Sequence, residues 1–145
     1  MGRFRMSWFF WILLAVFCWG IAPLAAKLGL AKSAPLSALL IRSIIVFFIL
    51  LGWGACTGHL SQLKSIEPRT WLLLAGEGIL GAIIGQWAYY NALKAGPLTA
   101  VIPLSATYPL MGLLLAVLLL GEKLSWGQVT GSFLIVAGIY LVYTS

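Results

Sequence analysis

Two ionisable side chains, Arg42 and Glu77, fall inside long apolar stretches of this 145-residue sequence. A charge at the centre of a bilayer costs about 2.5–3.5 kcal/mol on insertion scales, and such residues usually mark an ion, proton or substrate path. Glu77 could therefore bind a cation or carry a proton, or it could be a protonated, hydrogen-bonded structural carboxyl group. Arg42 could line a substrate path, or it could extend to the membrane interface or bond to carbonyl groups.

The depths of these two residues argue against a simple ion pair. At about 1.5 Å per helical residue, Glu77 lies roughly 10 Å and Arg42 roughly 20 Å from the side of the N-terminus. Counting about 100° per residue from Glu77 predicts one helix face whose residues are small or polar: Gly81, Gly85, Ala88 and Asn91. This face would pack against a neighbouring helix or line a wet cavity.

Prolines predict irregular helices. Pro23 follows Trp19 by four positions and precedes Lys27 by four, so a kink, an indole and an amine would share one face. Pro103 and Pro109 are the two predicted breaks in a later span.

Hydroxyl groups accompany the later pair of prolines, on Ser105, Thr107 and Tyr108. They can bond to carbonyl groups that proline leaves without a partner. Secondary transporters hold substrates at broken helices near the midplane, although membrane helices tolerate proline generally. The resulting set of candidate pathway residues is Glu77, Arg42, Trp19, Asn91 and Tyr108.

The last apolar segment carries a different pattern. Ser125 and Gln128 have the spacing of a capping box at a helix start. Gly127, Gly131 and Gly138 lie along the helix and are predicted to serve packing or dimerisation rather than transport.

The elements that must position these residues are membrane-spanning helices. Hydrophobic residues make up 62% of the chain, charged residues only 8%, and the mean hydropathy is +1.05. A spanning helix needs about 20 mostly apolar residues, and helices are the spans that satisfy their own backbone groups. The sequence therefore predicts an all-α membrane protein, a single five-helix domain over residues 1–145 with spans at 7–26, 35–54, 71–93, 98–120 and 126–143.

Loop charges give a weak orientation. With the N-terminus in the cytoplasm, five basic residues lie inside (Arg3, Arg5, Lys64, Arg69 and Lys123) and three outside (Lys27, Lys32 and Lys94). So small a bias permits dual topology in the inner, cytoplasmic membrane. The basic residues are scattered, which argues against a nucleic-acid partner. With His59 as its one histidine, the chain offers no assembly of catalytic groups, metal ligands or cofactor contacts, so an enzyme is not expected.

The ordered set of small, aromatic and charged residues resembles one EamA-like repeat of the drug/metabolite transporter superfamily. The residues that carry the resemblance are Trp19, Gly20, Lys27, Pro35, Arg42, Ala92, Leu93, Pro109, Gly121, Glu122, Leu124, Gly131 and Gly138. The resemblance implies a carrier in which two five-helix repeats face each other in inverted orientation around a cavity. One repeat is present here, so it also implies an antiparallel homodimer or a heterodimer with a related five-helix chain.

Glu77 departs from this resemblance, because similar sequences usually have a small or apolar residue there. The small multidrug carriers, four-helix relatives, have a glutamate in their first helix, which this chain lacks. The leading hypothesis is an exporter or exchanger of a small metabolite or drug that works by alternating access. A lipid-linked sugar or headgroup flippase subunit and a non-transporting structural or regulatory subunit are the alternatives.

Overall fold

The computed structural model describes residues 3–144, and it describes side chains from Phe10 onward. Within these residues every regular element is a helix. Five helical stretches are long and apolar enough to cross a membrane: Phe10–Leu30, Pro35–Cys56, Pro68–Ala95, Leu98–Leu120 and Trp126–Thr144. This confirms the predicted all-α fold with five spans. Arg3 and Arg5, whose charges enter the orientation argument above, are not among the residues whose side chains the structure describes.

The chain divides into two compact units, Met1–Ala95 and Gly96–Ser145. The first contains α1 (Arg3–Leu30), α2 (Pro35–Cys56), α3 (His59–Gln62), the 3-10 turn η1 (Leu63–Ser65), α4 (Pro68–Glu77), η2 (Gly78–Gly85) and α5 (Gln86–Ala95). The second contains α6 (Leu98–Ser105), α7 (Tyr108–Leu120) and α8 (Trp126–Thr144). That residues 1–145 form a single domain stays a prediction.

Prolines begin two of the long helices of the first unit. Pro35 opens α2 after an extended Ala34, and Pro68 opens α4 after an extended Glu67. Proline suits the first helical turn because its missing N–H would have no helical acceptor there and its φ is already close to helical. The third span therefore begins at Pro68, three residues before the predicted start at Trp71.

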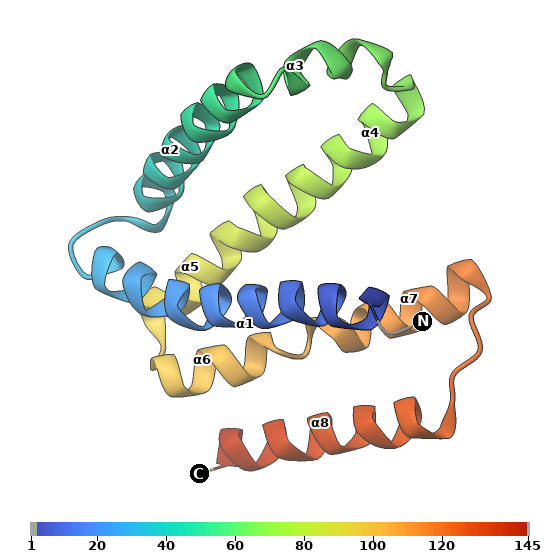
Figure 1. Cartoon of the computed structure of the whole chain (residues 1–145). Coiled ribbons are helices and arrows are strands. Elements are labelled where there is room, and N and C mark those ends of the chain that lie inside the picture. Colours follow the sequence, from blue (N-terminus) through green and yellow to red (C-terminus); the bar gives the residue numbers. More distant parts are fainter. Residues whose placement is uncertain (1–2, 145) are drawn as a thin grey trace. The chain divides into compact units, whose positions relative to one another are not determined.

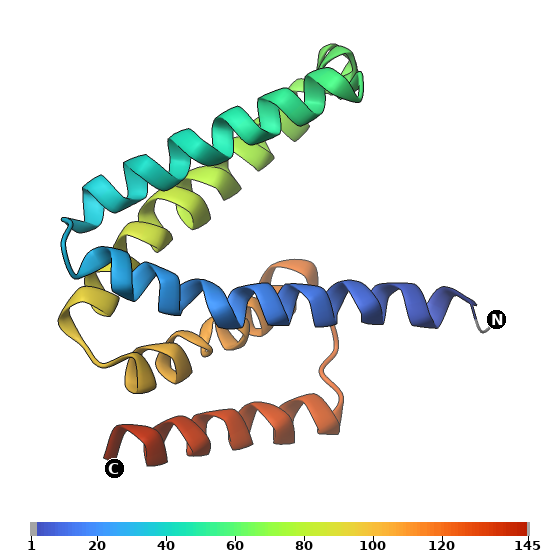
Figure 2. The same cartoon turned by 60° about the vertical axis from the view of Figure 1, so that its left-hand side comes forward.

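The first unit is held together near one end of its helices. In both views α2 runs antiparallel to the α4–η2–α5 stretch, and α5 lies beside the C-terminal part of α1 (Figures 1 and 2). The most buried side chains of this unit come from the end of α1, the start of α2 and the end of α5, and they are Leu30, Leu39, Tyr90 and Leu93. Burial of large apolar and aromatic groups makes this end the best-packed part of the unit.

The third span is not a uniform α-helix. Between α4 and α5, η2 is a π-helix of eight residues. The N–H of Gln86, just beyond it, donates to the carbonyl of Gly81, five residues back. Each π turn holds more residues than the 3.6 of an α-helix, so side chains beyond η2 lie at a different angle from the one that a uniform α-helix predicts.

The second unit contains the interrupted fourth span. α6 ends at Ser105 and α7 begins at Tyr108, and within this unit α8 contacts α6. α7 ends at Leu120 and is followed by Gly121, whose φ of 67° is left-handed. The N–H groups of Gly121 and Glu122 both donate to the carbonyl of Ala116, which closes this helix end.

Candidate functional site

Glu77 is the last residue of α4, directly before the π-helix, and its side chain is exposed. Its Oε1 lies 3.4 Å from the place where a Cβ on Gly81 would stand. The two residues therefore share a face, as predicted, and the absence of a side chain at Gly81 leaves room for the carboxylate. Within the described residues Glu77 makes no hydrogen bond or ion pair that would neutralise it.

The predicted face does not continue with α-helical spacing from Glu77 to Asn91, because η2 lies between them. Asn91 is on α5, where its Nδ2 donates to the carbonyl of Trp87 at 2.8 Å. Its Oδ1 takes no part in that bond. Glu77 thus lies beside Gly81, whereas the rest of the π-helix separates Glu77 from Asn91, which no α-helical periodicity could have predicted.

Arg42 and Trp19 lie on α2 and α1 with exposed side chains. Arg42 forms no hydrogen bond or ion pair with any described residue, so it is not paired with Glu77, in agreement with the depth argument. The two possible roles of Arg42, in a substrate path and at the membrane interface, both stay predictions.

Pro23 is buried inside α1, and the helix continues through it to Leu30. The first span is therefore helical on both sides of the proline, and the kink at Pro23 stays a prediction. Four positions further on, the Lys27 amine donates to the carbonyl of Leu93 on α5. In return the Lys94 amine of α5 donates to the carbonyl of Ser33, in the turn after α1, at 2.6 Å.

These two bonds form what we term the lysine clamp, made of Lys27, Ser33, Leu93 and Lys94. The carbonyl of Leu93 would find its α-helical partner at position 97, but Pro97 has no N–H. Lys27 supplies a donor instead, as basic groups often do at helix C-termini. Sequence reasoning placed Lys27 with Trp19 and missed this contact, although Pro97 and a lysine near a helix end were available signals.

The fourth span breaks between Pro103 and Pro109, where the sequence predicts irregularity. The hydroxyl of Ser105 donates to the carbonyl of Ile102 and that of Thr107 to the carbonyl of Leu104, both at 2.8 Å. These hydroxyl groups thus bond to carbonyl groups at the end of α6, which is the type of interaction that the sequence predicts. Tyr108 begins α7 with its ring largely exposed.

The start of α8 confirms the predicted capping box. The backbone N–H of Ser125 donates to Oε1 of Gln128 at 2.8 Å, and the N–H of Gln128 donates to the Ser125 hydroxyl at 3.3 Å. Along α8, a Cβ added at Gly131 or Gly138 would meet nothing within 4 Å, and one at Gly127 would meet only the Ser125 hydroxyl at 3.9 Å. Their role in packing or dimerisation stays a prediction.

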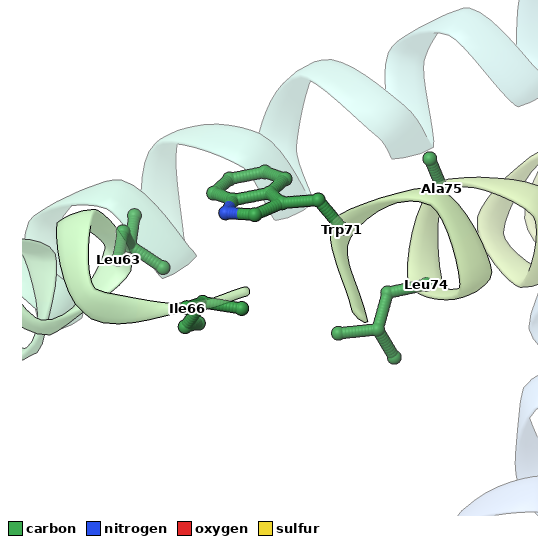
Figure 3. A pocket seen from close by; sticks show the side chains of 5 residues that line it. All are labelled: Leu63, Ile66, Trp71, Leu74 and Ala75. Carbon is green, nitrogen blue, oxygen red and sulfur yellow. The ribbon is translucent and has the colours of Figure 1, made fainter. Parts of the chain in front are cut away.

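The connection between α2 and α4 contains the short helix α3 and the turn η1. Figure 3 shows Trp71 and Leu74 of α4 facing Leu63 and Ile66 of the connection across an apolar hollow of about 250 Å³. Apolar residues at three-residue intervals, Leu60, Leu63 and Ile66, were the signal for this packing. The hollow is separate from the candidate pathway residues.

Comparison with known proteins identifies the type of chain. The EamA-like transporter family matches residues 6–144. An uncharacterized transporter encoded in the cobO 3′ region of a Sinorhizobium species is 36% identical over 137 residues, which are 94% of this chain and 96% of that protein. An uncharacterized transporter of Archaeoglobus fulgidus is 27% identical over 135 residues, 92% of this chain but 47% of that protein.

The chain also has a shorter match to the probable amino-acid metabolite efflux pump of Salmonella typhimurium. It is 38% identical over 68 residues, 47% of this chain and 20% of the pump. No solved structure matches the chain. The family match over nearly the whole sequence, together with five apolar helices, shows a multi-pass membrane transporter and confirms the predicted resemblance. The chain belongs to the EamA-like transporter family.

Proposed function

We propose that the chain exports or exchanges a small metabolite across the inner membrane, by alternating access, with Glu77 in the pathway. The observation that carries this proposal is an unpaired carboxyl group within a spanning helix of a transporter, next to a π-helix. Intramembrane carboxylates are costly and therefore usually mark an ion or proton path, and π segments occur frequently at functional sites. The Salmonella efflux pump makes amino-acid metabolites the first cargo class to test.

The working unit in this proposal is an antiparallel dimer, either of two copies or with a related five-helix chain. Five spans place the two ends of a chain on opposite faces of the membrane. The aligned residues amount to 47% of the Archaeoglobus transporter, so two chains of this size match the length of that protein. Two inverted repeats around a substrate site near the midplane are a common transporter arrangement.

Transport by the purified full chain in proteoliposomes tests the function. Labelled amino-acid metabolites are loaded inside, a pH gradient is imposed, and efflux is measured across a range of pH. We expect efflux that depends on pH, and a flattened dependence in Glu77→Gln because the variant cannot exchange a proton at this position. Glu122→Gln is the matched control, since Glu122 lies in the turn after α7 rather than in a span.

Two results would contradict the proposal in different ways. An unchanged pH profile in Glu77→Gln rejects the role of this carboxyl group while leaving transport intact. Failure of the wild-type protein to move any of the metabolites under any gradient rejects the proposed cargo and favours a flippase or a non-transporting subunit.

A further inference from the structure

The two α-helical parts of the third span differ in how firmly they are packed: α5 is anchored to the rest of the unit, and α4 is more weakly packed. α5 is held by the lysine clamp and by its buried residues Tyr90 and Leu93. α4 has no buried residue, and Leu72 and Leu73 on it are 75% and 66% exposed. If the helix changes shape between these parts, we expect α4 to move rather than α5, because α4 buries no side chain.

The π-helix η2 lies between the two parts. A π-helix is a rare form that is less favourable than an α-helix, and its turns hold additional residues. Conversion of η2 to α-helix would therefore rotate α4 about the helix axis relative to α5. Glu77, the residue next to η2 on the α4 side, would rotate with it.

A glycine at the far end of η2 permits the π form. A Cβ added at Gly85 would lie 3.0 Å from the carbonyl oxygen of Leu80, five residues earlier, so a side chain there would strain the π turn. By contrast, a Cβ at Gly76 or Gly78 would meet nothing within 4 Å. Alanine also favours α-helix over glycine generally, so Gly85→Ala should shift η2 toward the α form.

We propose that η2 is a rotary joint in the third span and that Gly85 is the positioning residue that allows it to turn Glu77 between two angular positions. This rests on the proposed role of Glu77 in transport. One position corresponds to the π form described here and the other to a fully α-helical span. Because α5 is clamped to α1 and the following turn, interconversion moves the carboxyl group rather than the clamped end.

Spin-label distances test the joint without measuring transport. Labels are attached at Leu73→Cys on α4 and Phe47→Cys on α2, both exposed, in a full-length chain in which Cys18 and Cys56 are replaced by serine. We expect two distance populations in the wild-type background and a single population in Gly85→Ala. Gly76→Ala, a glycine-to-alanine change on the same span outside η2, should behave as wild type.

Transport measurements test whether Gly85 acts through Glu77. Gly85→Ala should lower the maximal rate roughly tenfold, within the range of such couplings, with little change in KM. Combined with Glu77→Gln it should cause no further loss, since residues that act through one another are not additive. Additive losses would contradict the positioning role.

The two proposals fail separately. Normal transport by Glu77→Gln would contradict the proposed role of Glu77 in transport. It would not bear on the joint, which only the spin-label distances test. One distance population that is identical in wild type and Gly85→Ala overturns the joint. If Gly85→Ala does not insert, a single distance population in the wild-type background overturns the joint equally.

Discussion

At the scale of single residues, the polar groups of this transporter divide into those with partners and those without. The Lys27 and Lys94 amines and the Asn91 amide bond to backbone carbonyls. Glu77 and Arg42 have no such partner among the described residues. A polar group in lipid that lacks a partner is costly. Glu77 and Arg42 therefore make no polar contact with a described residue that would stabilise the fold.

Replacing Lys27 should therefore affect stability. Lys27→Met keeps the length of the side chain but removes the donor to Leu93, whose carbonyl has no N–H from Pro97. We expect a loss of about 1.5–3 kcal/mol in the free energy of unfolding, the usual contribution of a hydrogen bond to a charged group. Thermal unfolding of the detergent-solubilised chain measures it. Lys32→Met, in the turn that follows α1, is the control, because the Lys32 amine makes no hydrogen bond within the described residues. Equal losses would show that the bond from Lys27 contributes nothing.

At the scale of elements, the spans differ in how they depart from a straight α-helix. α1 absorbs Pro23 without interruption, the fourth span breaks into α6 and α7, and the third contains η2. Local sequence explains the second case, where two prolines and two hydroxyl groups fall together. It does not explain the third, because η2 is rich in glycine and isoleucine but contains no proline.

The end of α7 supplies a test at this scale. Gly121 has a φ of 67°, a conformation that costs other residues about 1–2 kcal/mol. We expect Gly121→Ala to destabilise the protein by about that amount, measured by thermal unfolding. Gly112→Ala, within α7, should be neutral or stabilising, because a Cβ there meets nothing within 4 Å and alanine favours helix. The same effect from both substitutions would contradict the left-handed cap.

At the scale of the whole molecule, one chain leaves much apolar surface uncovered. Few of the described side chains are buried, whereas large apolar residues on every span are exposed. In a membrane, lipid or a second chain covers such surface. An odd number of spans and a charge bias of five to three are compatible with insertion in both orientations.

Reporters fused to each end of the chain test the inverted homodimer. We expect each terminus to give signals on both faces of the membrane. Lys64→Gln should increase the fraction with the N-terminus outside, and Lys32→Gln, which removes a charge from the opposite side, should decrease it. One fixed orientation for wild type would contradict the homodimer and leave the heterodimer with a related chain.

Hydropathy, composition and local motifs were sufficient for the fold class, the five spans, the break in the fourth span and the capping box at Ser125. The physical reason is that a bilayer demands about 20 apolar residues per span, and caps and proline breaks depend on neighbours within four residues. The tertiary structure alone decided the lysine clamp, since Lys27 and Leu93 are 66 residues apart and meet only because α1 and α5 pack together. It also decided η2, and with it the angle between Glu77 and Asn91, because a change from α to π turns depends on backbone geometry that helical periodicity assumes to be constant.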